Sequence, residues 1–170
     1  MAPLLYINKT DADDSLAQTV CERGRIVGVA LPSGVRDFGD YLFYKCTNLR
    51  SVSLPDSLEC IPRGTFFECR SLSGIVFPPG LIEIGSYAFF SCAFQSVEIP
   101  ESVVKIGTMA FSDCSLLSDI RLHNGLTDMG DKVFDNTKWS YENRGKGAIY
   151  FGELFICTAI LNTILDYRGI

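Results

Sequence analysis

A repeat of about 23 residues runs through the sequence and limits the folds that are open to it. An apolar residue followed by proline recurs in steps of 23, 23 and 22 residues, at residues 31–32, 54–55, 77–78 and 99–100. A cysteine keeps the same steps at Cys46, Cys69, Cys92 and Cys114. A phenylalanine does so at Phe43, Phe66, Phe89, Phe111 and Phe134. Self-similarity at such a period is the signature of a solenoid, in which each repeat is one coil stacked on its neighbours.

Apolar side chains fall at fixed places within each unit. With the residue before each proline numbered as position 1, they occupy positions 1, 5, 8, 13, 19 and 22. Positions 22 and 1 are two residues apart, which is the period of a strand with one buried face. The proline at position 2 lacks the N–H that would continue this strand. Positions 10–16, such as residues 86–92, predict a short helical or 3₁₀ turn, so each coil is expected to hold one strand, a turn and a return leg.

Position 9 is glycine in most units, at Gly39, Gly85, Gly107 and Gly130, but it is Pro62 in the second. Proline holds φ near −65°, so a position that accepts proline does not require a positive φ. We therefore expect this glycine to serve close packing or a tight turn rather than a left-handed backbone.

The ends of the array differ from its middle, and we predict one structural domain with a cap at each end. Residues 25–138 form the predicted solenoid, and residues 25–31 are expected to be the strand that opens the stack. Residues 1–24 are the predicted N-terminal cap. Residues 139–170 are the predicted C-terminal cap, with a hairpin about Gly152 and Glu153. Caps are expected because an open solenoid end exposes apolar surface and strand edges.

Composition excludes several classes of function. Twenty acidic against fifteen basic residues give a net charge of −5, which argues against nucleic-acid binding. The single histidine argues against histidine metal sites and Ser-His-Asp catalysis, and no phosphate-binding motif occurs. We therefore predict that the chain is not an enzyme and has no catalytic residues, no metal site and no cofactor.

Neither a membrane span nor an export signal is predicted. The most apolar stretch, residues 149–165, is interrupted by polar residues and is shorter than the roughly 20 residues of a bilayer span. The first ten residues lack the basic and apolar regions of a secretory signal. The chain is therefore expected either to work in the cytosol or to be a piece of a longer exported protein.

The cysteine ladder has three interpretations. Because the ladder runs in register with core phenylalanines, and free cysteine is among the most buried residue types, we favour a structural role in the core. Stacked coils lie about 4.8 Å apart, so disulfides between them remain an alternative. A metal site is a weaker alternative, since the spacing of the cysteines is far from any metal-binding pattern. If a disulfide forms, Cys21, Cys60 and Cys157 are the better candidates, and His123 is expected to be an ordinary surface residue at position 2.

The outward-facing positions of the strands are the first candidate binding surface. Positions 21 and 23 should point away from the core, between the buried positions 19, 22 and 1. The candidate residues there are Ser51, Ser53, Val76, Ser96, Glu98, Asp119 and Arg121. They include no aromatic anchor, which favours a flat or extended contact over a deep ligand pocket. The alternative is a strand face that is merely solvated.

Aromatic residues on the outer leg form a second candidate surface. Positions 11 and 14 hold Tyr41, Tyr44, Phe67, Tyr87 and Phe90. Exposed rings there would suit contact with a protein or a glycan. The alternative is that they cover the edge of the core, next to the phenylalanine at position 13.

The repeat unit resembles the BspA-like leucine-rich repeats. Residues 99–114 (IPESVVKIGTMAFSDC) follow the pattern LPxxLxxIGxxAFxxC nearly position by position. The tail is also similar to the segment that closes such arrays in bacterial members. The resemblance covers residues 25–155. It implies an α/β, right-handed leucine-rich-repeat solenoid of about five 22–23-residue coils, with short strands on the concave face and short helical or 3₁₀ turns outside.

The resemblance also implies a function. Members are commonly secreted or cell-surface proteins that act in adhesion and protein–protein contact, and they share no catalytic residues. We therefore expect a non-enzymatic interaction or adhesion module of a bacterial surface. Its partner is expected to be a protein, with host and extracellular-matrix proteins as candidates, and the chain is expected to be a monomer or part of a longer protein. The alternatives are a cytoplasmic scaffold of the same fold and a glycan-binding accessory module.

Overall fold

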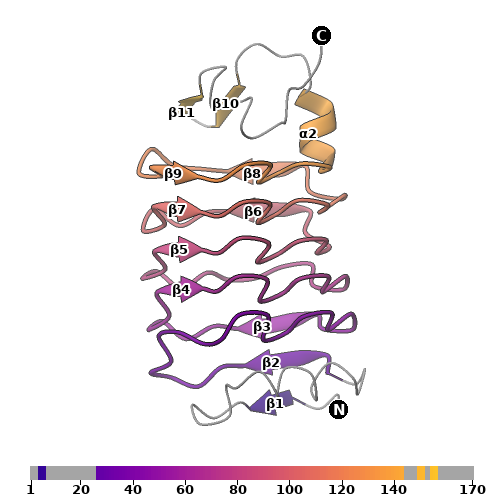
Figure 1. Ribbon diagram of the computed structural model, residues 1–170, viewed down its shortest axis with the longest axis vertical. Coiled ribbons are helices and arrows are strands. Elements are labelled where there is room, and N and C mark those ends of the chain that lie inside the picture. The colour runs from indigo at the N-terminus through magenta and orange to yellow at the C-terminus, as the bar shows by residue number, and fades with distance from the viewer. Residues whose placement is uncertain (1–3, 7–25, 144–148, 152–153, 157–170) are drawn as a thin grey trace.

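The computed structural model describes residues 4–6, 26–143, 149–151 and 154–156, with side chains for residues 26–143. Figure 1 shows the coils of residues 26–137 stacked along one axis. Two sets of short parallel strands run up the stack. One set comprises β1 (Leu4–Tyr6), β2 (Gly28–Ala30), β3 (Ser51–Ser53), β6 (Ser96–Glu98) and β8 (Asp119–Arg121). The other comprises β4 (Cys60–Ile61), β5 (Glu83–Ile84), β7 (Lys105–Ile106) and β9 (Asp128–Met129).

The first set of strands confirms the predicted strand at the end of the first, third and fourth units, whereas residues 74–76 at the end of the second unit form no strand. Register joins residues one repeat apart, with Val29 opposite Val52 and Val97 opposite Ile120. The side chains alternate, so that Val97 is buried between the exposed Ser96 and Glu98. The strands end before position 2, as the prolines require. We call the outward-pointing side of β2, β3, β6 and β8 the strand face.

The expectation that residues 25–31 open the stack is wrong. β1 precedes them and pairs in parallel with β2, with Leu5 opposite Val29. The predicted N-terminal cap therefore contains a strand that continues the sheet by one further row. The rest of that cap lies outside the described residues.

The second set of strands was not expected from the sequence. β4, β5, β7 and β9 lie at positions 7 and 8 and form one four-stranded sheet in that order. The isoleucine at position 8 keeps register through the stack, with Ile61 opposite Ile84 and Ile84 opposite Ile106. A strand of two residues is too short to produce an alternating sequence pattern, which explains why it was missed.

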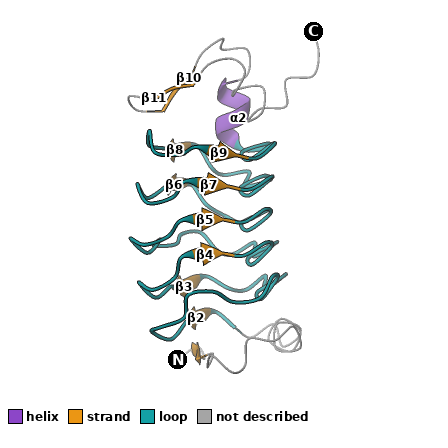
Figure 2. Ribbon diagram, turned by 60° about the vertical axis from the view of Figure 1, so that its left-hand side comes forward, coloured by secondary structure: helices purple, strands orange, loops and turns teal. Residues whose placement is uncertain are grey.

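The outer leg is a chain of turns rather than a helix (Figure 2). Bonds of the 3₁₀ type occur, such as Tyr44 N–H to Tyr41 O at 3.0 Å. Positions 11 and 15 nevertheless take positive φ in five successive coils, as at Tyr87 (59°) and Ser91 (58°). Left-handed residues interrupt a right-handed helix, so the expected helical piece stays a turn. Its N–H groups bond to the next coil instead, as in Phe66 N–H to Ala88 O at 2.8 Å.

The core is a column of phenylalanine rings. Phe43, Phe66, Phe89, Phe111 and Phe134 are all fully buried. Successive rings stack at centroid distances of 5.4, 5.3, 5.1 and 5.6 Å. This confirms the core assignment of position 13.

The end of the column is closed by α2 (Lys138–Asn143). Trp139 lies edge-on against Phe134 at 6.2 Å, and its main-chain N–H donates to Leu117 O at 2.8 Å. Thr137 caps the helix, because its Oγ1 accepts the N–H of Ser140 at 3.0 Å. The predicted hairpin is confirmed as β10 (Ile149–Phe151) paired antiparallel with β11 (Leu154–Ile156). Gly152 and Glu153 lie outside the described residues.

The glycine at position 9 serves close packing, as predicted. None of the four glycines at this position has a positive φ. A Cβ at Gly85 would lie 2.7 Å from the Arg63 nitrogen of the preceding coil, closer than real Cβ atoms approach. At Gly85, Gly107 and Gly130 the coils stack this closely because no side chain intervenes.

Candidate functional site

The structure brings the predicted strand-face residues onto one side of the stack. Six of the seven lie on strands and are exposed: Ser51 and Ser53 on β3, Ser96 and Glu98 on β6, and Asp119 and Arg121 on β8. The seventh, Val76, is 84% exposed and is the most exposed large apolar side chain of the described residues. Strands and coil stacking thus place residues from four repeats on one surface, and whether they bind a partner remains a prediction.

Charge on the strand face is concentrated on the rows of β6 and β8. Arg121 lies between two carboxylates, with Nη1 3.7 Å from Glu98 and Nε 3.8 Å from Asp119. These ion pairs are exposed, so each contributes little to stability. Two carboxylates against one guanidinium leave this part of the surface negative.

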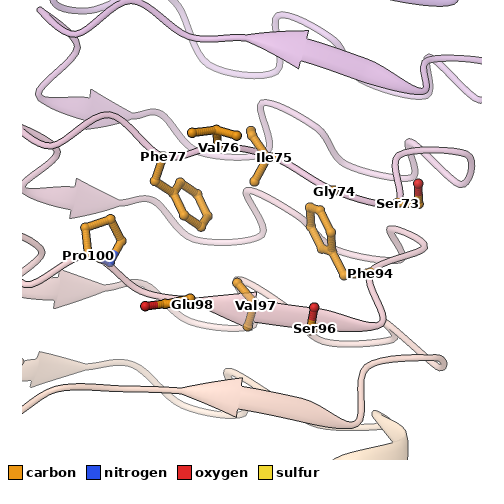
Figure 3. A pocket seen from close by; sticks show the side chains of 10 residues that line it. All are labelled: Ser73, Gly74, Ile75, Val76, Phe77, Phe94, Ser96, Val97, Glu98 and Pro100. Carbon is orange, nitrogen blue, oxygen red and sulfur yellow. The ribbon is translucent and has the colours of Figure 1, made fainter.

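The strand ladder is broken between β3 and β6. Residues 74–76 stand where a strand belongs, yet they pair with neither neighbour, and the sheet of β1, β2 and β3 is separate from that of β6 and β8. A shallow pocket of about 460 Å³ opens beside this segment (Figure 3). Its apolar wall includes Phe77, Phe94 and Val97, and Ser96 and Glu98 lie at its edge.

The break lies where one coil is a residue short. Cys69 is three residues before Leu72, whereas Cys92 is only two residues before Phe94. In the shortened coil the Ala93 N–H donates to Leu72 O at 2.9 Å. The 22-residue step is visible in the sequence. The sequence did not reveal that this step breaks the strand ladder, or that Phe77 and Phe94 line a pocket.

The outer aromatic residues pack mainly against one another. Tyr44, Phe67 and Phe90 form a stack, with centroids 5.2 and 4.8 Å apart. Tyr41 and Tyr87 flank the guanidinium of Arg63, whose carbon lies 6.0 and 5.6 Å from their centroids. Only Tyr41 and Tyr44 reach 36% and 38% exposure. Because the stacked rings cover each other's faces, mainly edges remain for a ligand, which favours the role of covering the core.

The ladder cysteines donate hydrogen bonds between coils. The thiols of Cys69, Cys92 and Cys114 each lie 3.1–3.2 Å from the carbonyl oxygen of the core phenylalanine one coil earlier. Burial raises the pKa of Cys114 to about 12 and raises that of Cys92 well above its usual range. These thiols therefore stay protonated and donate a second hydrogen bond to carbonyl oxygens that also accept a main-chain N–H within their own turn, as Phe43 O does from Cys46 at 3.1 Å.

The other candidate groups form no further site among the described residues. In the described part of the chain no disulfide forms among Cys46, Cys60, Cys69, Cys92 and Cys114, and Cys21 and Cys157 lie outside it. Among the described residues, no cluster of three or more metal-ligating side chains occurs. His123 is half-buried, and its Nδ1 accepts the N–H of Gly125 at 3.1 Å. No helix in the described residues is long and apolar enough to cross a membrane.

Comparison with known families agrees with this architecture. The model of the BspA type leucine-rich repeat region matches residues 36–153 with six copies. The chain belongs to this family. BspA-type and other leucine-rich repeats are generally binding modules, because stacking creates an extended surface to which several repeats contribute. The BspA-type assignment therefore supports a protein-interaction module.

Three solved structures resemble this BspA-type chain. A leucine-rich repeat protein from Bacteroides ovatus shares 30% identity and a TM-score of 0.63, over 78% of this chain and 32% of that one. The T. pallidum leucine-rich repeat protein shares 27% identity and a TM-score of 0.55, over 81% and 71%. A leucine-rich cell surface protein from Faecalibacterium prausnitzii shares 27% identity and a TM-score of 0.59, over 69% and 31%. The BspA-type chain thus spans about a third of the Bacteroides protein, and a comparison with curated proteins finds no match.

Proposed function

We propose that this chain is a non-enzymatic protein-interaction module that holds its partner on the strand face, as part of an adhesive protein at a bacterial surface. The observation that carries the proposal is the exposure of Ser51, Ser53, Ser96, Glu98, Asp119 and Arg121 on one surface built by successive coils. Small and charged side chains across several rows suit an extended contact with a protein surface. The F. prausnitzii relative, a leucine-rich cell surface protein, supports the location.

The experiment is binding of the folded chain to an array of extracellular-matrix proteins and glycans. A triple variant, Ser51→Lys, Ser53→Lys and Ser96→Lys, changes the strand face by three positive charges. A second triple variant, Ser33→Lys, Thr47→Lys and Ser115→Lys, adds the same charge at exposed hydroxyl residues outside the strand face. We expect protein binding to be lost in the first variant and retained in the second.

Three results would count against the proposal, each in a different way. Equal loss in both variants would show a nonspecific charge effect. Glycan binding that neither variant changes would point to the outer aromatics and the accessory-module alternative. No binding to any extracellular component would favour a scaffold of the same fold inside the cell.

A further inference from the structure

The break in the strand ladder leaves main-chain groups without partners. In β6 and its continuation, Ile99 N–H donates to Arg121 O at 3.0 Å, and Gln95 O accepts the N–H of Ser118 at 3.0 Å. Successive residues of a strand direct their main-chain groups to opposite sides, so those of Ser96 and Glu98 point toward residues 74–77. No hydrogen bond from residues 74–77 meets them in the described residues. β6 therefore has a free edge inside the stack rather than at its end.

This free edge runs beside the pocket. Figure 3 shows residues 73–77 and β6 as two separate lines of main chain with Phe77, Phe94 and Val97 between or beneath them. Val76, 84% exposed, lies on the facing line, and Glu98 is the one charged residue of the lining. The site thus combines unpaired donors and acceptors, an apolar wall and one negative charge.

These features define the chemistry of an occupant. Donors and acceptors on alternate residues are matched by an extended main chain, which adds to a sheet edge as a further strand. Alternate side chains of such a strand point to opposite sides, so one aliphatic residue can enter the pocket while its neighbours stay at the rim. A basic neighbour would meet Glu98, whose carboxylate is 76% exposed and shares the guanidinium of Arg121 with Asp119.

We propose that an extended strand of a partner protein, with an aliphatic residue next to Lys or Arg, adds along the free edge of β6 and places its aliphatic side chain in this pocket. This inference rests on the proposed function, because it names where on the strand face the partner docks. The short coil then has a purpose, since a 23-residue coil with a continuous ladder would leave no edge to pair with.

The first measurement is amide hydrogen exchange in the free chain. Ser96 and Glu98 amides should exchange at least about tenfold faster than those of Val97 and Ile99, which face β8. If all four exchange equally slowly, the ladder is continuous and the inference is wrong.

The second measurement adds a strand-forming probe, a seven-residue peptide of alternating Lys and Val with blocked ends. We expect saturable binding below about 1 mM and slowed exchange at Ser96 and Glu98. A twin with Glu in place of Lys tests the charge, and a twin with N-methylated Val residues removes the main-chain donors. Both twins should bind at least about tenfold more weakly. No saturable binding of the Lys–Val peptide, or equal binding of the N-methylated twin, would overturn the inference.

Two matched variants locate the charge. Glu98→Lys should weaken binding of the Lys–Val peptide at least about tenfold, whereas Asp119→Lys, the same change on β8 away from the pocket, should change it less than about threefold. Equal effects would indicate general attraction to an acidic surface and would reject the site.

The same variants separate this inference from the proposed function. Suppose that the strand-face triple variant loses binding of a protein partner found on the array, but that Glu98→Lys does not change this binding and the partner slows exchange at no amide of β6. The strand face then binds the partner and this site does not.

Discussion

At the residue scale, the repeated cysteine fills an apolar position of the core and also donates a hydrogen bond. Serine at the same place would supply the donor but would bury a more polar group, and alanine would remove the side-chain hydrogen bond that joins the two coils at the phenylalanine carbonyl. A thiol is both a small apolar filler and a weak donor, which suits a site that requires burial and one hydrogen bond. Thr137 replaces the cysteine at the last coil, where its Oγ1 donates to Phe134 O at 2.7 Å.

The ladder thiols should be inert in the native chain. Because burial raises the pKa of Cys92 and Cys114, the thiolate that reacts with alkylating reagents is nearly absent at pH 8. We expect iodoacetamide to label both at least about a hundredfold more slowly in the native chain than in the chain unfolded in urea. Peptide mass spectrometry measures each site separately, and rapid native labelling of Cys69 or Cys92 would contradict the assignment.

The same pKa shift has a consequence for stability in alkali. Cys114 has a reference pKa of 9.0 and a native pKa of about 12, so the folded state holds more protons between these values. The free energy of unfolding should therefore be unaffected by this thiol below pH 9 and should fall as the pH rises from 9 to 12. Cys114→Ser, which keeps a donor that does not ionise in this range, should show a smaller alkaline loss.

At the element scale, the phenylalanine column packs each coil against the next. Phe89 stacks on Phe66 and Phe111 at 5.3 and 5.1 Å and meets Phe94 edge-on at 5.4 Å. Phe89→Ala should lower the free energy of unfolding by about 3–5 kcal/mol, because it removes a fully buried ring and leaves a cavity. Urea unfolding measures the change.

The adjacent Phe90 gives the matched control for that variant. It is half-buried and stacks on one ring of the outer leg, Phe67, at 4.8 Å. Phe90→Ala should therefore cost clearly less than Phe89→Ala. A loss below about 1 kcal/mol for Phe89→Ala, the size of an average substitution, would contradict the core assignment.

Several of these elements follow from the repeat alone, and others depend on contacts that a single coil does not reveal. The phenylalanines of position 13 are buried as their spacing predicts, whereas position 22 is buried at Val97 and Ile120 and only partly buried at Val52 and Ile75. The packing role of position 9 follows from Pro62. Sequence reasoning missed β1 because residues 4–6 lie outside the clear repeat. It missed β4, β5, β7 and β9 because two-residue strands exist only through pairing with the next coil.

The candidate site shows the same division between local pattern and stacking. Alternation along a strand predicts which side chains of β3, β6 and β8 point outward. The break at residues 74–76 depends on how a coil one residue shorter meets the coil before it, which no local pattern encodes. The left-handed residues at positions 11 and 15 were likewise hidden, because the residue types there vary from tyrosine to glutamate.

At the scale of the whole molecule, each coil contacts mainly its neighbours, so stability is distributed along the stack. Trp139 is 7% exposed and covers the last ring of the column. Trp139→Ala should destabilise the coil of β9 most and the coil of β4 least, because an uncovered end frays first. Amide exchange at residues 128–129 and 60–61 compares the two coils.

Tyr141 on the same helix provides the control for the end cap. It is 54% exposed, and its hydroxyl donates to Asn136 Oδ1 at 3.1 Å. Tyr141→Ala should lower the free energy of unfolding by less than about 1 kcal/mol. An effect of Trp139→Ala spread evenly over all coils would show that the molecule unfolds as one unit.

The hydrogen bonds between coils run along the axis of the stack. Their direction determines how the protein unfolds under a pulling force. Tension along that axis loads the bonds of one coil at a time, so coils should peel away in sequence instead of resisting together in shear. A released coil of 23 residues can extend to roughly 80 Å, where the stacked coil occupied about 5 Å. A tether built this way lengthens in steps under load and can shorten again when the load falls.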